Sequence, residues 1–201
     1  ALGVQAGDAV LTNAFTLAPV PGAIAALGAR PIFVEVTENL TLDFYDLTAK
    51  AHSTGARVLM LSHMRGHLCD MEALVALCDR LGVQIIEDCA HTMGAAWKGV
   101  PSGRQGLIGC YSMQTYKHIN AGEGGFIVSD DPQIMARAVL LSGSYMLYAR
   151  HRAAQKRHRG FNRVGHHIGH HIGFPDTQRA KQVCRLGHAG VKISPGQGFG
   201  L

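Results

Sequence analysis

Short apolar segments alternate with segments of helical character along residues 1–150, and this order narrows the possible folds. The apolar segments do not alternate between apolar and polar residues, which is typical of strands buried on both faces. Such strands, when helices separate them, indicate a mostly parallel sheet with helices on both sides. We therefore predict an α/β fold of three layers. The expected strands are 8–12, 31–36, 57–62, 83–87, 107–111 and 126–129, and the expected helices are 17–28, 42–51, 71–81 and 132–141.

Capping residues support these helix assignments. Asp70 and Gly82 flank the third helix, and an aspartate N-cap and a C-terminal glycine commonly begin and end a helix. Thr41 is the expected N-cap of the second helix, and Asp130 or Asp131 that of the fourth. These side chains would satisfy backbone groups that a helix leaves unpaired at its ends.

The charge of the chain divides it near residue 150. Residues 1–150 contain 10 Lys and Arg against 13 Asp and Glu, whereas residues 151–201 contain nine against one, together with seven of the 12 histidines. Hydrophobic residues make up 47% and charged residues 16% of the whole chain, a composition that can bury a core. We predict a folded domain over 1–150 and a basic tail, rich in His, Arg and Gly, over 151–201.

The predicted tail has three interpretations. It shows little hydrophobic periodicity, so a disordered or frame-shifted, non-native end is favoured. A transition-metal site would use four histidines that form i,i+4 pairs if the segment is helical, although the intervening glycines disfavour that helix. A nucleic-acid arm would use the tail's cations and would bind weakly and salt-sensitively. The four histidines are His166, His167, His170 and His171.

The sequence gives only weak signs of disulfide bonds, a metal site or membrane insertion. Five cysteines occur without a Cys-x-x-Cys pair, which favours free thiols in a reducing compartment. His63, His67 and Cys69 lie close in sequence, but no fourth ligand follows at a usual spacing, so loop histidines are favoured and no metal is predicted. The apolar segments are too short to span a bilayer, and the N-terminus has no signal-peptide core. The expected location is the cytoplasm, and without an initial Met the chain is expected to be a fragment or a processed product.

One lysine lies in a glycine-rich loop between two predicted strands. Lys117 follows Ser112 by five residues and precedes the run Gly122-Glu123-Gly124-Gly125. A lysine amine in such a loop can attack an aldehyde and form a Schiff base. A solvated surface lysine in a glycine turn is the alternative, and this loop alone does not decide between them.

A carboxylate is expected near this lysine. Asp88 follows the strand 83–87, and the carboxyl ends of parallel strands gather ligands at one edge of a sheet. A lysine and a carboxylate at one edge suit pyridoxal phosphate, because the lysine binds its aldehyde and the carboxylate keeps its pyridine nitrogen protonated. Ser112 could contact the phosphate. In the alternative interpretation, Asp88 is a turn residue and His91 a core histidine.

Several segments together carry a family resemblance. They are Gly7-Asp8, residues 27–36, residues 86–95 with the sequence Glu-Asp-Cys-Ala-His, and the lysine loop that ends in Gly-Glu-Gly-Gly. In this order and spacing, across about residues 5–150, the chain resembles the DegT/StrS-type sugar aminotransferases. These are fold type I pyridoxal-phosphate enzymes, so the resemblance implies part of the large domain of that fold.

The resemblance also implies roles for individual residues. Lys117 would form the internal aldimine with pyridoxal 5'-phosphate and shuttle protons during catalysis. Asp88 would pair with the pyridine nitrogen, and His91 would lie by the ring and its phenolic oxygen. Ser112 would contact the phosphate, and Gln114 lies in the same loop. A lysine at 117 argues against the dehydratase branch of the family, in which a histidine stands there.

Departures from the family pattern concern the ends and one aromatic position. The family's glycine-hydroxyl phosphate loop precedes anything that matches Ala1, and no C-terminal domain of the family is recognised after about residue 151. Leu17 occupies the place where the family often has an aromatic over the cofactor ring, with Phe15 two residues away. The chain therefore looks like the middle of a longer protein.

The function implied by the resemblance is amino transfer to a keto sugar in polysaccharide biosynthesis, and a nucleotide-linked sugar is the favoured substrate. Glutamate is the expected amino donor, and the full-length parent is expected to be a homodimer that binds neither membrane nor nucleic acid. Two alternatives remain open. The chain could be an inactive truncated remnant, or a non-enzymatic chain whose basic tail binds metal or nucleic acid.

Overall fold

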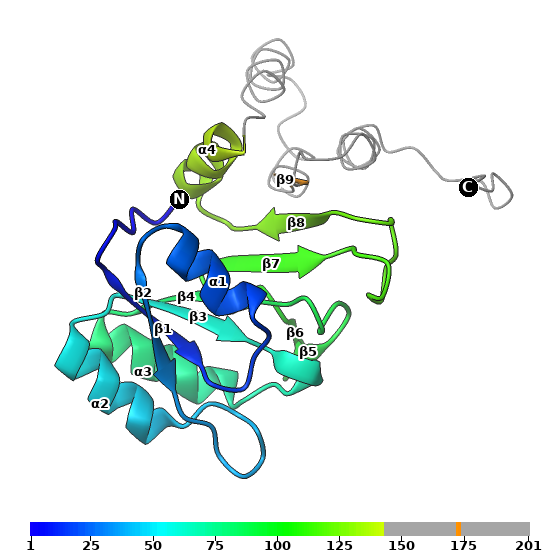
Figure 1. The fold of residues 1–201 in the computed structure, drawn as a ribbon. Helices are drawn as coiled ribbons and strands as arrows, with labels where there is room; N and C mark the ends of the chain where they lie inside the picture. Colours follow the sequence, from blue (N-terminus) through cyan, green and yellow to red (C-terminus); the bar gives the residue numbers. More distant parts are fainter. Residues whose placement is uncertain (143–171, 174–201) are drawn as a thin grey trace, which may run out of the picture.

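The structure is a computed structural model that describes residues 1–142 and the short strand 172–173. The strands are β1 (Ala9–Asn13), β2 (Arg30–Val34), β3 (Val58–Ser62), β4 (Gln84–Asp88), β5 (Ala96–Trp97), β6 (Val100–Pro101), β7 (Ile108–Ser112), β8 (Gly125–Val128) and β9 (Ile172–Gly173). The helices are α1 (Pro19–Ala26), α2 (Phe44–Thr54), α3 (Met71–Leu81) and α4 (Pro132–Leu141), with a 3-10 turn η1 (Met64–Gly66). The main sheet has the order β2-β1-β3-β4-β7-β8-β9, and β5 and β6 form a separate hairpin (Figure 1).

Most of the described sheet is parallel. β1 pairs with β2 and β3, β3 with β4, and β4 with β7, all in parallel register. β8 is antiparallel to β7, and the two residues of β9 pair antiparallel with β8. The predicted mostly parallel sheet is therefore confirmed. Because β4 and β7 run in the same direction, their carboxyl ends lie at one edge of the sheet, where the loop to β8 begins.

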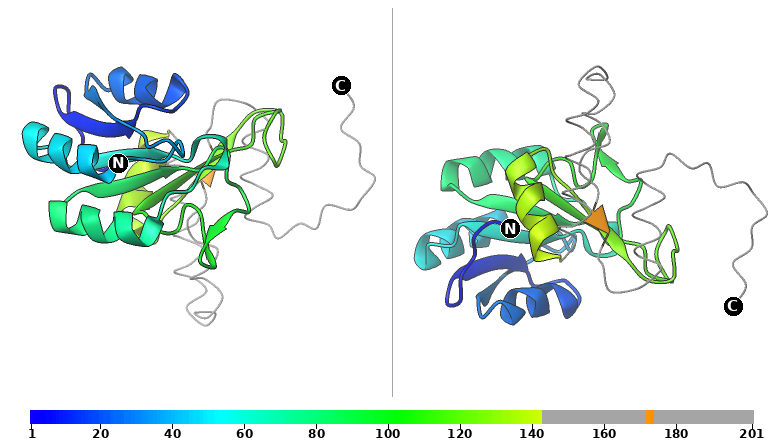
Figure 2. Two further views of the ribbon diagram at one scale, coloured as in Figure 1. Left: turned by 90° about the horizontal axis from the view of Figure 1, so that it is seen from below. Right: turned by 90° about the horizontal axis from the view of Figure 1, so that it is seen from above.

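Helices cover both faces of the sheet, which makes the three layers expected from the sequence (Figure 2). α2 and α3 lie on one face, where Leu47 and Leu74 pack in one buried cluster with Leu11 of β1. α1 lies on the other face, where Ile24 packs with Val10. Val10 and Leu11 serve opposite faces because strand side chains alternate. Burial on both faces explains why these strands are apolar without a period of two.

The N-cap of α2 differs from the prediction. Asp43, not Thr41, precedes the helix, and its carboxylate accepts hydrogen bonds from the backbone N–H groups of Tyr45 and Asp46. The hydroxyl of Thr41 lies 3.0 Å from that of Thr37 instead. The helix consequently begins two residues later than expected, because an aspartate that reaches two N–H groups outcompetes a threonine that is bonded elsewhere.

The ends of α3 and α4 agree better with the sequence. Asp70 caps α3 through a hydrogen bond to the N–H of Ala73, and Gly82 follows the helix with a left-handed φ of 65°. Asp131, rather than Asp130, caps α4 through two backbone N–H groups. α1 is shorter than its predicted range of 17–28, since Pro19 stands at its first turn and its last residue is Ala26.

The carboxyl ends of two strands, β4 and β7, carry candidate functional residues. Asp88 and Ser112 are the last residues of β4 and β7, although we expected each to follow its strand. The β5–β6 hairpin was not predicted. Its turn contains Lys98 and Gly99, both with positive φ (48° and 84°), and a Lys-Gly pair between two-residue strands is a weak sequence signal.

Candidate active site at the carboxyl edge of the sheet

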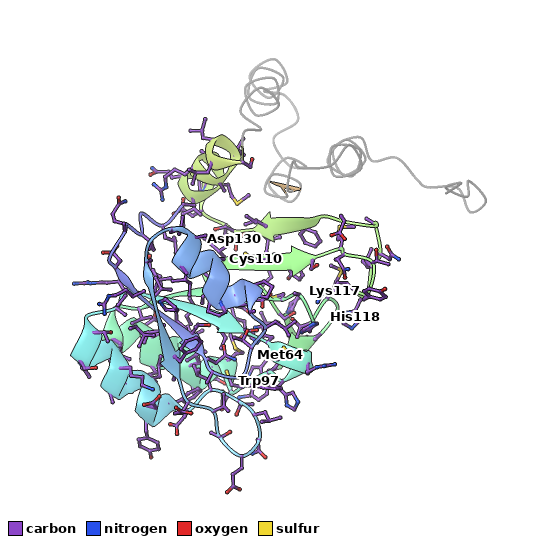
Figure 3. All side chains as sticks on the ribbon, viewed as in Figure 1. Met64, Trp97, Cys110, Lys117, His118 and Asp130 are labelled. Atoms are coloured by element: carbon purple, nitrogen blue, oxygen red, sulfur yellow. The ribbon has the colours of Figure 1, made fainter. Side chains whose placement is uncertain are left out.

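The carboxyl edge of β4 and β7 carries the residues that the sequence singled out. Asp88 is in register with Cys110 of β7, and Ser112 lies two residues farther toward the carboxyl end of that strand. The loop from β7 to β8 then carries Lys117, and Figure 3 shows Lys117 and His118 beyond the carboxyl end of β7. Asp88 and Lys117 therefore lie at the same edge of the sheet, as predicted from the strand order.

Two donors, a hydroxyl and a backbone N–H, orient the carboxylate of Asp88. Its Oδ2 accepts a hydrogen bond from the hydroxyl of Ser62 at 3.1 Å, and its Oδ1 accepts one from the N–H of Ala90 at 3.1 Å. Asn13 in turn holds the backbone of Ser62, accepting its N–H at 2.8 Å and donating to its carbonyl at 3.0 Å. The ends of β1, β3 and β4 thus position one half-buried carboxylate. The sequence did not reveal this network, because its members come from separate strands.

The lysine loop is held by hydrogen bonds within itself. Ala121 donates its N–H to the carbonyl of Met113, and Met113 donates to that of Gly124. The N–H of Lys117 donates to the carbonyl of Gln114 at 2.9 Å, which makes a tight turn just before the lysine. Gly124 has a φ of 127°, a value that side chains disfavour, so glycine is needed where the loop returns to β8.

Ser112 and Gln114 contribute to the shape of this loop. The hydroxyl oxygen of Ser112 accepts the N–H of Gln114 at 3.3 Å. The side-chain oxygen of Gln114 accepts the N–H of Tyr116 at 3.0 Å. Both side chains therefore stabilise the turn that presents Lys117, and any contact with a phosphate remains a prediction.

The charges of Asp88 and Lys117 both act on the pKa of His91. Burial lowers the pKa of His91, and the charges of Lys117, Arg65 and His118 lower it further, whereas the carboxylate of Asp88 raises it. The net direction is downward from the ordinary histidine value. Asp88 and Lys117 thus both lie close enough to His91 to act on its pKa, and His91 is only half-buried rather than a core histidine.

A buried hydrogen-bonded pair of polar side chains, His63 and Glu87, lies behind this edge, and the sequence did not reveal it. His63 and Glu87 are 1% and 0% exposed, and His63 Nε2 lies 2.9 Å from Glu87 Oε2. Glu87 also accepts backbone N–H groups from Gly103, Gln105 and Gly106. Burial by itself would raise the pKa of Glu87, but the hydrogen bonds from His63 and the backbone outweigh it and hold that pKa low.

The structure groups His63 with other possible metal ligands than the sequence suggested, since His67 and Cys69 do not belong to the group found. The group of possible ligands found in the described part of the chain is His63, Glu87 and Cys89, whose ligand atoms lie within 4.8 Å of one another. Glu87 is already saturated with hydrogen bonds, and burial raises the pKa of the Cys89 thiol, which disfavours the thiolate that a metal needs. The geometry therefore favours a structural polar cluster. His63 lies in the loop between β3 and η1, as expected, and its side chain is buried there.

The structure shows the surroundings of Leu17 and Phe15, the two residues considered for stacking on a cofactor ring. Leu17 is 46% exposed. Phe15 instead packs edge-on against His67, with ring centroids 6.3 Å apart. A contact of Phe15 or Leu17 with a cofactor ring remains untested.

A parallel sheet with a lysine and a carboxylate at its carboxyl edge is typical of pyridoxal-phosphate transferases of fold type I. The sequence model of the DegT/DnrJ/EryC1/StrS aminotransferase family matches residues 1–186, and the chain belongs to this family. The match extends past residue 150 and so includes part of the segment predicted as a tail. The family resemblance inferred from residues 5–150 is confirmed.

Individual relatives support this assignment. The chain is 39% identical over 134 residues to Protein MosB of Rhizobium meliloti, covering 67% of this chain and 26% of that protein. It is 34% identical over 142 residues to GDP-perosamine synthase of Vibrio cholerae (70% and 38% covered). It is also 34% identical over 138 residues to L-glutamine:scyllo-inosose aminotransferase of Streptomyces griseus (69% and 32%). Among solved structures, the aminotransferase TlmJ of Streptoalloteichus hindustanus has a TM-score of 0.65 at 30% identity, covering 70% of this chain and 38% of that one.

The chain spans only about a quarter to two fifths of the curated relatives described above. Among the described residues, none of the helices combines the length and apolar character needed to cross a bilayer. Cys69, Cys78, Cys89 and Cys110 are free thiols, as expected. The tail histidines and Cys184 lie outside the described residues, so the predicted metal or nucleic-acid roles of the tail are not tested.

Proposed function

We propose that this chain is the cofactor-binding part of a pyridoxal-phosphate-dependent sugar aminotransferase. One observation supports the proposal: the charges of Asp88 and Lys117, at the carboxyl edge of the sheet, both act on the pKa of His91, in a chain that belongs to an aminotransferase family. Activity, substrate and partners belong to the whole protein, of which this chain supplies a part. The cytoplasm and a homodimer are the proposed setting.

The residues at this edge fit the cofactor's functional groups. The amine of Lys117 is available to bind the aldehyde. The carboxylate of Asp88 is available to pair with the pyridine nitrogen, and Ser62 and Ala90 already orient it. Ser112 offers a hydroxyl for the phosphate. When bound, pyridoxal phosphate would supply an electron sink that stabilises negative charge on the substrate carbon. Gln114 would keep the lysine turn in shape through its bond to Tyr116.

Each residue then has a separate task. Asp88 keeps a proton on the pyridine nitrogen, because an ionised carboxylate stabilises the positive charge beside it. Lys117 would hold the cofactor through its amine, and the free amine could move a proton at the substrate carbon. His91, neutral because its pKa is lowered, can donate a hydrogen bond without bringing a positive charge next to Lys117. The Asn13–Ser62 contact keeps Asp88 aligned throughout.

The proposed substrate is a keto sugar, and a nucleotide-linked one is favoured. The name of GDP-perosamine synthase, 34% identical, denotes a product attached to a nucleotide. A cyclic keto-polyol is the second candidate, because the Streptomyces griseus relative is named for scyllo-inosose at the same identity. Glutamate is the proposed amino donor. Glutamine is the alternative, because the name of the Streptomyces griseus relative contains it. Steady-state assays of the full-length protein with both ketone classes and both donors would separate them.

Reductive trapping tests the role of Lys117. The chain is incubated with excess pyridoxal phosphate and reduced with borohydride, and the modified peptide is identified by mass spectrometry. We expect the label on Lys117, and its loss in Lys117→Ala. Lys50→Ala is the matched control, since Lys50 lies on α2 in an ion pair with Asp46, and it should keep the label. A label that survives Lys117→Ala, or that spreads evenly over the lysines, would contradict the proposed role.

Cofactor retention distinguishes an enzyme part from an inactive remnant. After dialysis, we expect the 201-residue chain to retain little cofactor, because it spans only about a quarter to two fifths of the length of its curated relatives. Full stoichiometric retention would count against the remnant interpretation. Trapping at Lys117 with weak retention would support an incomplete but correctly arranged site.

A further inference from the structure

The turn that follows β3 is held in place by the buried hydrogen bond between His63 and Glu87. Residues 63–67 form this turn, which begins at the buried His63 and includes η1. The side chain of His63 contacts Glu87, and its backbone N–H donates to the carbonyl of Asp88 at 3.1 Å. Within the turn, Gly66 donates to the carbonyl of His63 and His67 to that of Met64, both at 3.1 Å. The position of the turn relative to β4 is therefore set by buried contacts.

Arg65 occupies an unusual backbone conformation in this turn. Its φ and ψ are 57° and 18°, in the left-handed region, which is unfavourable for a non-glycine residue. Its side chain is exposed, so burial of apolar surface does not explain the strain. In this conformation its backbone N–H donates to Nδ1 of His91 at 3.3 Å. The strained residue thus contacts a residue of the candidate site.

We infer that Arg65 is a positioning residue that fixes the tautomer of His91. An N–H group can donate only to an unprotonated ring nitrogen, so Nδ1 of His91 has to be the acceptor. A neutral imidazole has one proton, and that proton therefore lies on Nε2. His91 then presents Nε2–H as a hydrogen-bond donor. Resting on the proposed function, the acceptor is the phenolic oxygen of the cofactor.

The charges around His91 act in the same direction as this contact. A protonated ring carries N–H on both nitrogens, and the Arg65 N–H would then lose its acceptor. The groups that shift the pKa of His91 are Lys117, Arg65 and His118, which lower it, and Asp88, which raises it. Burial contributes most and also lowers it. The backbone N–H of Arg65 selects the tautomer, and its guanidinium helps keep the ring neutral.

The tautomer can be measured without cofactor. The chain is labelled with ¹⁵N-histidine, and the His91 signals are assigned by their absence in His91→Gln. We expect nitrogen shifts of an unprotonated Nδ1 and a protonated Nε2, and a pKa below the ordinary value of about 6.5. A protonated Nδ1 would overturn the inference, and so would a ring that is charged at neutral pH. Because this experiment uses the unmodified chain, it does not depend on a variant that folds.

A pair of variants tests the guanidinium separately. Arg65→Gly keeps the N–H and suits the left-handed conformation, but removes the charge. We expect an unchanged tautomer and a raised His91 pKa. Arg80→Ala removes a charge from the exposed surface of α3 and should leave both unchanged. Equal pKa shifts in the two variants would overturn the role of the guanidinium. If His91 has the expected tautomer but borohydride reduction does not label Lys117, the proposed function is contradicted and the inference about Arg65 is not.

Discussion

Asp88 is the residue on which the proposed chemistry depends most directly. Its two oxygens accept hydrogen bonds from the Ser62 hydroxyl and the Ala90 N–H, both at 3.1 Å. These donors fix the direction of the carboxylate, so its remaining lone pairs are available at the edge of the sheet. A partner for a pyridine nitrogen needs this combination of charge and orientation, because a rotated or protonated carboxyl group would not hold the proton.

Replacing Asp88 by asparagine should separate binding from catalysis. The change keeps the size and removes the charge, so the full-length variant should still attach cofactor at Lys117. Amino transfer should slow by several orders of magnitude, roughly the effect of removing a charge partner from a catalytic unit. Single-turnover kinetics would measure it. Asp79→Asn, on the exposed surface of α3, serves as control. Near-normal turnover of Asp88→Asn would show that another carboxylate faces the ring.

Glu87 has a structural task at the neighbouring position. Glu87→Gln would replace one acceptor oxygen by an NH₂ group facing backbone N–H donors. We expect the free energy of unfolding to fall by about 3 kcal/mol, since hydrogen bonds to a buried charge are lost and donors are left unpaired. Urea unfolding at neutral pH measures this. Glu72→Gln, which removes the charge from the exposed pair with Lys98, should leave the free energy of unfolding nearly unchanged, because solvent screens that pair.

The same pair of variants should differ in their response to acid. The pKa of Glu87 in the folded chain lies below its ordinary value of 4.5. The stability that the ionised carboxylate contributes is therefore present above pH 4.5 and is lost as the pH falls through the lowered folded-state pKa. The gap in stability between the native chain and Glu87→Gln should be constant near neutrality and narrow in acid. A gap that widens below pH 4.5 would contradict an ionised Glu87.

At the scale of elements, α2 offers a direct test of helix capping. Asp43 accepts two backbone N–H groups at the start of the helix, whereas Thr41 lies outside it and contacts Thr37. Asp43→Ala should lower the free energy of unfolding by about 1 kcal/mol, and Thr41→Ala should change it by less than about 0.5 kcal/mol. Thermal or urea unfolding of the two variants compares them. The opposite order would restore Thr41 as the cap.

The elements themselves were largely predictable, and their ends were less so. α3 follows the sequence at both ends, because Asp70 and Gly82 are strong local signals on either side of an apolar pattern. Asp43 and Thr41 compete for the start of α2, and the outcome depends on which side chain has another partner. The β5–β6 hairpin has too few residues to produce a periodic pattern.

For the whole molecule, the boundary near residue 150 is the main open prediction. The charge pattern predicts that residues 151–201 do not belong to the folded domain, whereas the family match reaches residue 186 and β9 pairs with β8. If the boundary holds, deleting 151–201 should leave the thermal unfolding midpoint of the rest unchanged. Deleting only 187–201 is the control. A drop in the midpoint after the longer deletion alone would place residues 151–186 in the fold.

The sequence by itself determined the alternation of strands and helices, the fold class, and the candidates Asp88 and Lys117. These depend on periodicity, capping and the order of residues along the chain, all of which are local. Tertiary structure alone decided which side chains meet. His63 reaches Glu87 across 24 positions, and Arg65 reaches His91 across 26. Such contacts depend on strand order and register, and on a left-handed turn that no local pattern encodes, so only the folded chain brings these groups together.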